Sequence, residues 1–176
     1  MSKKRLALIS TGGTIEKTYN ELEGVLHNTA SVLDVMLATL ELRGAELVRV
    51  PLMNKDSTEM GSGDHALIAD TAHTMAKAYD GVIIVHGTDR LAETGEATFE
   101  RGHPPVPVVL TGAMRPYVMR NTDALQNLTE ALLAAQILPP GVYTAMHGQV
   151  LRFPGVRKDR AEGTFVGGVE LAGEGM

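Results

Sequence analysis

The chain has 176 residues, of which 44% are hydrophobic, so it is long enough to fold as one domain with a buried core. Its net charge is −5 and its longest basic run, residues 3–5, is short, which argues against a nucleic-acid partner. No apolar run approaches the ~20 residues that span a membrane. Cysteine is absent, which excludes disulfides, thiolate metal sites and a cysteine nucleophile.

Two further features of the composition bear on location and cofactors. The apolar stretch near the N-terminus, residues 6–9, is shorter than the roughly seven residues of a signal-peptide core, so we expect a cytoplasmic protein. The histidines are scattered and form no His-Glu-x-x-His pair. We therefore do not expect a zinc site.

Five short runs rich in branched aliphatic residues predict β-strands. Their apolar residues are nearly continuous rather than alternating, which is typical of strands buried on both faces of a sheet. The predicted strands are residues 6–10, 46–50, 81–86, 106–111 and 142–147.

Helix-like stretches lie between these runs. Ser31 and Asp64 are placed to cap the first two helices, Gly44 to end the first, and Pro139 follows the fourth. The predicted helices are residues 32–43, 65–79, 89–101 and 121–136. Because strands alternate with helices, we expect an α/β fold, a three-layer αβα sandwich with a mainly parallel sheet, built as a single domain over residues 1–176.

Polar residues follow each predicted strand. The carboxyl ends of parallel strands meet at one edge of a sheet, where ligands of such folds bind. Small hydroxyl residues, an acid and a base should therefore converge there. The segments concerned are residues 11–15, 54–60, 86–89 and 112–116, and a polar loop ending in residues 157–159.

Taken singly, these segments have simpler interpretations. Residues 11–14, Thr-Gly-Gly-Thr, are compatible with a plain turn or a phosphate loop, although the Gly-Lys-Ser/Thr ending of a phosphate loop is missing. His86 fits a satisfied core histidine. Thr88 or Asp89 would serve as an ordinary helix cap, and Lys158 as a solvated lysine.

Taken together, the segments resemble the bacterial-type L-asparaginase family. The resemblance spans residues 5 to about 168 and corresponds to the N-terminal domain of that family. It is greatest to the unusually short asparaginases, and it implies that the C-terminal domain is absent. The matching blocks, in chain order, are Thr11-Gly12-Gly13-Thr14-Ile15, Asp56-Ser57-Thr58-Glu59-Met60, His86-Gly87-Thr88-Asp89, Gly112-Ala113-Met114-Arg115-Pro116, and Asp123 with Asn127-Leu128.

The resemblance also assigns catalytic roles. It implies that Thr14 is the nucleophile and that Tyr19 is a lid tyrosine lying over it. Thr88, Asp89 and Lys158 would form a second catalytic group. A threonine hydroxyl needs such partners because it is a poor nucleophile at neutral pH.

Substrate binding and assembly are implied in the same way. Ser57, Thr58 and Asp89 would hold the substrate, L-asparagine, through its α-carboxylate and α-amino groups. We expect a homodimer or homotetramer that needs neither metal nor cofactor and binds neither nucleic acid nor membrane.

The expected reaction is hydrolysis of L-asparagine to L-aspartate and ammonia through a β-aspartyl ester on Thr14. Four alternatives remain at this point. They are a glutaminase-leaning amidohydrolase, the ammonia-producing subunit of a tRNA amidotransferase, a catalytically silent protein that binds a small amino acid, and a nucleotide-binding doubly wound domain.

Overall fold

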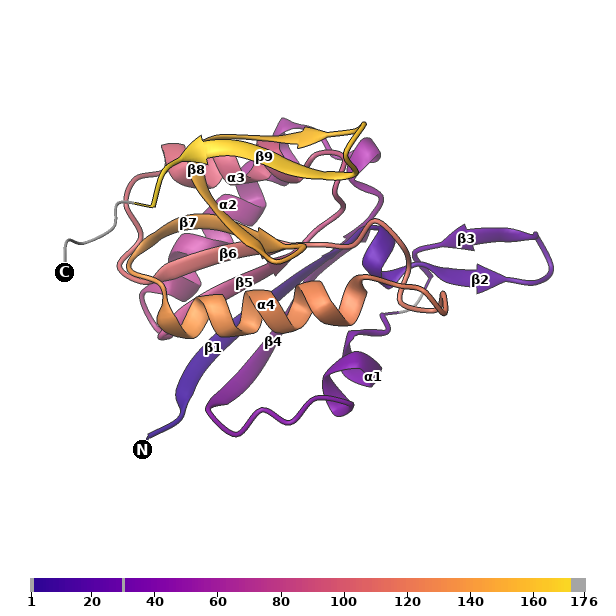
Figure 1. Ribbon diagram of the computed structural model, residues 1–176, viewed down its shortest axis with the longest axis horizontal. Coiled ribbons are helices and arrows are strands. Elements are labelled where there is room, and N and C mark those ends of the chain that lie inside the picture. Colours follow the sequence, from indigo (N-terminus) through magenta and orange to yellow (C-terminus); the bar gives the residue numbers. More distant parts are fainter. Residues whose placement is uncertain (1, 30, 172–176) are drawn as a thin grey trace.

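A computed structural model describes residues 2–29 and 31–171, and its centre is a seven-stranded sheet (Figure 1). The first five strands in sheet order pair in parallel. The sixth pairs antiparallel with both the fifth and the seventh. In sheet order the strands are β4 (Ala45–Lys55), β1 (Lys4–Gly12), β5 (Gly81–Val85), β6 (Pro107–Thr111), β7 (Gly141–Met146), β8 (Gln149–Asp159) and β9 (Thr164–Val169).

Helices cover both faces of this sheet. One apolar layer lies between the sheet and α1 with α4, and a second lies between the sheet and α2 with α3 (Figure 1). The expected three-layer αβα sandwich with a mainly parallel sheet is therefore confirmed. The helices are α1 (Leu33–Ala38), α2 (Ser62–Ala76), α3 (Leu91–Glu100) and α4 (Ala124–Ile137). None of the described helices is long and apolar enough to cross a membrane.

The four predicted helices exist, with shifted ends. The first is much shorter than expected, because the Thr39 hydroxyl bonds the Met36 carbonyl 2.6 Å away and competes with the next helical turn. The second begins earlier, at Ser62. Asp64 lies inside its first turn, where its carboxylate accepts a hydrogen bond from the Gly61 N–H at 3.0 Å.

Two predictions about the sheet were wrong. The run at residues 46–50 is not buried on both faces, because its residues are exposed or half-buried. Its strand, β4, is an edge strand that pairs only with β1. The expected polar loop before Lys158 is instead strand β8, which pairs antiparallel with β7 and β9. The sequence pattern missed it because only Phe153 and Val156 of β8 are buried and the strand contains Pro154 and Gly155.

Short elements extend from the carboxyl edge of the sheet. The 3₁₀ turn η1 (Thr14–Glu16) follows β1, and a second 3₁₀ turn, η2 (Ser57–Glu59), follows β4. After η1 the chain forms a two-stranded hairpin, β2 (Thr18–Asn20) with β3 (Val25–His27), which projects away from the sheet (Figure 1).

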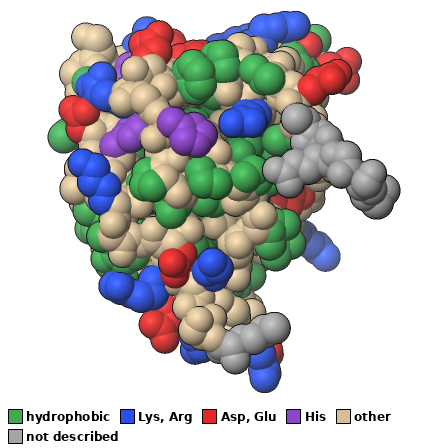
Figure 2. Space-filling model, turned by 90° about the vertical axis from the view of Figure 1, so that its left-hand side faces the viewer, with side chains coloured by type: hydrophobic (Ala, Val, Ile, Leu, Met, Phe, Trp, Pro, Cys, Tyr) green, Lys and Arg blue, Asp and Glu red, His purple; other side chains and the backbone are tan. Residues whose placement is uncertain are grey.

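On the side of the molecule away from this hairpin, cationic and anionic side chains are interspersed rather than gathered into one basic patch (Figure 2).

Candidate active site

Glycines bring the loops after β1, β4 and β5 into direct contact. Gly12 and Gly13 have φ angles of 101° and 83°, which L side chains rarely adopt. A Cβ atom on Gly13 would lie 2.4 Å from the Cα of Gly87, so the two backbones cross with no room for a side chain. Thr14 and Thr88 each follow directly after this crossing.

The loop after β4 packs on the other side of Gly87. A Cβ atom there would lie 2.5 Å from the Oγ of Ser57, which is itself buried with 1% of its surface exposed. Ser57 therefore lies against the same crossing point as Thr14 and Thr88. These three predicted segments therefore meet, as does the segment after β6, since a Cβ atom on Gly112 would lie 3.2 Å from the Thr88 Cγ2.

Lys158 reaches this edge from β8. Its Nζ atom lies 2.8 Å from the Thr88 Oγ1 and 2.9 Å from the Asp89 Oδ1, and its side chain is only 16% exposed. It is therefore not the solvated lysine of the simpler interpretation. The hydrogen bond from Lys158 is the largest effect on the Asp89 carboxyl and holds its pKa below the ordinary value. Arg160 also lowers this pKa, whereas desolvation raises it.

Asp89 is not a helix cap. The helix α3 begins two residues later, at Leu91, and no side chain caps its first turn. The Asp89 Oδ1 atom instead accepts from Lys158 and also lies 3.1 Å from the Arg160 Nη2. Both cations contact the same oxygen, and among the described residues no hydrogen bond or ion pair to Oδ2 is found.

Thr58 and Tyr19 are placed differently from the group around Thr88. Thr58 is exposed, and its Oγ1 and backbone N–H bond the Asp56 carboxylate at 2.8 and 3.0 Å. Tyr19 lies on the projecting hairpin with 64% of its surface exposed. Although Tyr19 and Thr14 are both described, no hydrogen bond joins them in this arrangement of the hairpin.

Asp56 is a charged residue beside the site to which the sequence pattern assigned no role. Its carboxylate also accepts from Lys17 at 2.6 Å, and this bond, with the Thr58 N–H, lowers the pKa of Asp56 to about 2. A hollow of about 460 Å³ between the hairpin and η2 is lined by polar side chains that include Lys17 and Asp56. It borders the candidate site without containing Thr14 or Thr88. Among the described residues, no group of three or more His, Asp or Glu side chains is placed to hold a metal ion.

Comparison with known proteins decides the family. A family model described as "Asparaginase, N-terminal" matches residues 5–165, a range that contains all of the signature blocks. The chain belongs to the asparaginase family. Its sequence is 36% identical to an L-asparaginase of Thermococcus kodakarensis over 151 residues, which cover 84% of this chain and 45% of that protein.

The other relatives include an amidotransferase subunit and solved structures of asparaginases. A glutamyl-tRNA(Gln) amidotransferase subunit of Methanobrevibacter smithii is 32% identical over 85% of this chain and 35% of its own length. The solved structure of the T. kodakarensis L-asparaginase matches with a TM-score of 0.76 at 34% identity, again over 84% of this chain and 45% of that chain. A structure named "Probable Cytoplasmic L-asparaginase" from Campylobacter jejuni matches with a TM-score of 0.75 at 30% identity over 93% of this chain and 51% of that one. The chain therefore spans about half the length of these asparaginases, and less of the amidotransferase subunit.

His86, the first residue of the block at residues 86–89, is a satisfied core histidine, as expected. His86 is fully buried, with Nδ1 2.7 Å from the Gly87 carbonyl and Nε2 2.7 Å from the Thr94 hydroxyl. A carbonyl only accepts, so Nδ1 carries the proton and Nε2 accepts from Thr94. The Thr94 oxygen in turn accepts from the Nδ1 of His65 at 2.7 Å. This buried chain holds the Gly87 carbonyl in place beside Thr88.

Burial of His86 predicts a pH dependence of stability. Desolvation lowers its pKa to about 4, whereas an unfolded histidine has a pKa of about 6.5. Protonation therefore favours the unfolded chain, and the contribution of His86 is complete above pH 6.5 and lost as the pH falls towards 4. We expect the free energy of unfolding to decrease by about 3 kcal/mol across that window, measured by denaturant titration.

The His86→Gln variant is the control, because it cannot titrate. Its free energy of unfolding should fall less steeply over the same window. The remaining slope combines His65, whose pKa burial also lowers, with Glu16, whose pKa burial raises and which acts in the opposite direction. Loss of Asp56 ionisation comes at lower pH, towards its pKa of about 2. Equal slopes for both proteins between pH 6.5 and 4 would contradict a neutral, buried His86.

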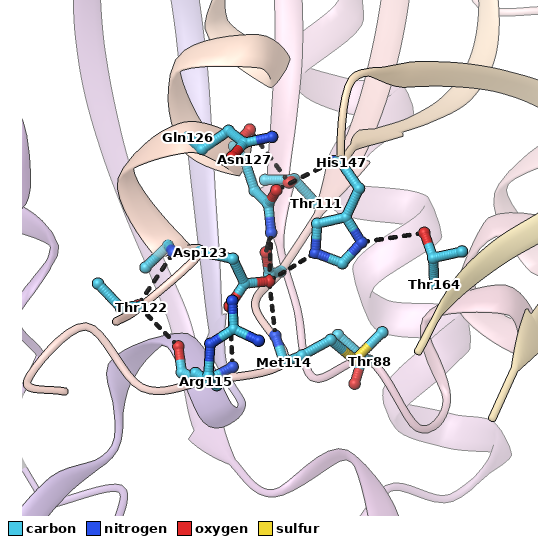
Figure 3. Close-up of polar contacts among 12 residues, drawn as sticks. Thr88, Thr111, Met114, Arg115, Thr122, Asp123, Gln126, Asn127, His147 and Thr164 are labelled. Atoms are coloured by element: carbon cyan, nitrogen blue, oxygen red, sulfur yellow. Dashed lines mark hydrogen bonds and ion pairs between the residues drawn. The ribbon is translucent and has the colours of Figure 1, made fainter. Parts of the chain in front are cut away.

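A second buried network joins the block at residues 112–116 to the end of the sheet (Figure 3). Asp123, immediately before α4, accepts from the backbone N–H groups of Met114 and Arg115 at 3.0 and 2.9 Å. Its Oδ2 atom also lies 2.7 Å from the Nε2 of His147, whose other nitrogen contacts Thr164 at 2.9 Å. The sequence pattern singled out Asp123 and missed His147 and Thr164, because nothing local links them.

Proposed function

We propose that the chain hydrolyses L-asparagine to L-aspartate and ammonia, with Thr14 as the nucleophile. The observation that carries the proposal is the contact of the Lys158 ammonium with Thr88 and Asp89, directly beside the backbone crossing that presents Thr14. Small hydroxyls, a carboxylate and a cation are the groups that acyl transfer by a threonine requires. The names of the asparaginase-family relatives favour an amide as substrate.

In the proposed first step the Thr14 Oγ attacks the side-chain carbonyl carbon of asparagine. The Oγ–C bond forms, the carbonyl becomes an oxyanion, and backbone N–H groups of the Thr14 and Thr88 loops stabilise it, at about 3 kcal/mol for a good donor. The C–N bond then breaks. The amide nitrogen leaves as ammonia after taking up the proton that Thr14 lost.

In the second step water attacks the β-aspartyl ester on Thr14. The ester C–O bond breaks, Thr14 recovers its proton, and L-aspartate is released. Lys158 donates to the Thr88 hydroxyl in the resting site, so in this proposal it orients Thr88 and carries a proton in transit. Tyr19 would act in the proton transfer from Thr14 once the hairpin closes over the site.

Substrate binding is proposed at Ser57, Thr58 and Asp89. The Oδ2 of Asp89 would bind the α-ammonium group, because Lys158 and Arg160 contact the other oxygen. Ser57, at the crossing point, is placed for the α-carboxylate. Thr58 lies at the exposed rim, where it would affect the choice between substrates rather than the chemistry.

Glutamine is the second candidate substrate, since one group of relatives consists of glutamyl-tRNA(Gln) amidotransferase subunits. Ammonia release from L-asparagine and from L-glutamine by the purified protein tests both. We expect kcat/KM for asparagine to exceed that for glutamine by at least about tenfold. Equal or reversed values would favour the glutamine reaction. Binding of either amino acid without ammonia release would indicate a silent binding protein.

Location and assembly complete the proposal. The name of the C. jejuni structure favours a cytoplasmic protein. We also propose a homodimer or homotetramer, because α4 exposes Leu133 and Ile137, at 56% and 69%, beside a largely apolar hollow. Sedimentation at micromolar concentration checks this, and a strict monomer would contradict it.

A further inference from the structure

The turn between β7 and β8 contains a histidine at a position where the backbone conformation favours asparagine. His147 and Gly148 form a two-residue hairpin turn, with φ angles of 56° and 74°. Two positive φ angles define a type I′ turn, for which Asn-Gly is the preferred sequence. His147 is the single non-glycine residue with a positive φ among the described residues. Such a residue points to a use for its side chain.

The His147 side chain uses both of its nitrogens. Asp123 is an acceptor, so the Nε2 of His147 donates to its Oδ2 at 2.7 Å. Burial of Asp123 favours its protonated form, yet the hydrogen bonds from Met114, His147 and Arg115 hold its pKa below the ordinary value. The Nδ1 of His147 is hydrogen-bonded to the Thr164 hydroxyl at 2.9 Å (Figure 3).

Thr164 belongs to the part of the molecule that carries Lys158. It is the first residue of β9 and pairs with Asp159, and the adjacent pair is Lys158 with Phe165. The Gln149 side chain also bonds the Thr164 hydroxyl at 3.1 Å, so the two ends of β8 lie close together. The bend of β8 that brings its ends together is visible in Figure 1. We call the end of β8 and the start of β9, residues 157–159 and 164–166, the lysine tip.

We propose that His147 is a positioning residue: by bonding Asp123 and Thr164 together, it holds the lysine tip so that Lys158 stays within hydrogen-bond distance of Thr88. The other end of this link is firm, since Asp123 is also bonded by two backbone N–H groups and by Asn127. The effect of His147 on the reaction rests on the proposed function. Its effect on the lysine tip does not.

The His147→Asn variant separates this role from a structural one. Asparagine suits the type I′ turn better than histidine, so the melting temperature should stay within about 3 °C of the wild type or rise. The shorter side chain cannot bridge Asp123 and Thr164. We expect kcat for asparagine hydrolysis to fall by at least about tenfold with KM within about threefold, because the Lys158 ammonium is displaced while substrate contacts remain.

Two matched pairs provide the controls. Thr164→Val removes the hydroxyl and should behave like His147→Asn, whereas Thr164→Ser retains it and should keep kcat within about threefold. Gly148→Ala strains the same turn at φ 74° but leaves the bridge intact. It should lower the melting temperature and keep kcat. A fall of kcat in Gly148→Ala equal to that in His147→Asn would mean that His147 only supports the turn.

Amide hydrogen exchange at the lysine tip gives a readout that does not depend on activity. Exchange at residues 157–159 should accelerate in His147→Asn and Thr164→Val but not in Thr164→Ser. If the wild type releases ammonia from neither amino acid, the proposed function fails while the exchange result still decides the positioning role. Unchanged exchange at residues 157–159 in His147→Asn would overturn the proposal, whatever the kcat of that variant.

Discussion

The Thr14→Ala variant is expected to lose amide hydrolysis by several orders of magnitude while remaining folded. Removing a covalent nucleophile leaves no atom to form the acyl intermediate. The turn that presents Thr14 is held by backbone hydrogen bonds, from the Glu16 N–H to the Gly13 carbonyl and from the Lys17 N–H to the Thr14 carbonyl. Neither bond uses the Thr14 side chain. Ammonia release and circular dichroism, measured on the same preparation, check both halves of the expectation.

Thr11 supplies a matched control in the same segment. Its hydroxyl is buried and donates to the Val85 carbonyl at 2.8 Å, so its role is structural. Thr11→Val should lower the free energy of unfolding by about 1 kcal/mol and leave kcat near the wild-type value. Thr14→Ser, which retains a hydroxyl, should keep measurable turnover. Activity close to wild type in a folded Thr14→Ala protein would remove Thr14 from the mechanism.

Lys158→Met should also reduce kcat strongly, by about 10²-fold or more. Methionine roughly preserves the volume but donates no hydrogen bond to Thr88 and brings no positive charge to Asp89. The fold should tolerate the change, since Arg160 still contacts the Asp89 Oδ1 at 3.1 Å. Steady-state kinetics with asparagine, together with thermal unfolding, measures the two effects separately.

Arg160→Met is the comparison for this charge. Arg160 contacts the same carboxylate oxygen but is 75% exposed, so solvent screens it and its loss should change kcat by less than about threefold. If Lys158→Met reduces kcat by less than about tenfold, Lys158 has only an ordinary ion-pairing role. Similar losses in both variants would assign the effect to the charge state of Asp89 rather than to a proton carried by Lys158.

The order of strands and helices was largely predictable from the sequence, since buried parallel strands and amphipathic helices leave strong local patterns. The last two strands were not, because β8 buries only Phe153 and Val156 and is interrupted by Pro154 and Gly155. Helix ends were also displaced where side chains made other bonds, as Asp89 does with Lys158 instead of capping α3.

For the candidate site, the sequence by itself determined which chemical groups are present and that the loops carrying them would meet at one edge of a parallel sheet. It also identified the family, through signature blocks that the family model matches. Only the tertiary structure decided how the groups pair, because those contacts join residues far apart in the chain. Lys158 and Thr88 are 70 residues apart, and His147 and Asp123 are 24 apart. No local pattern encodes such contacts, since they depend on the bend of β8 and on glycines that let two backbones touch.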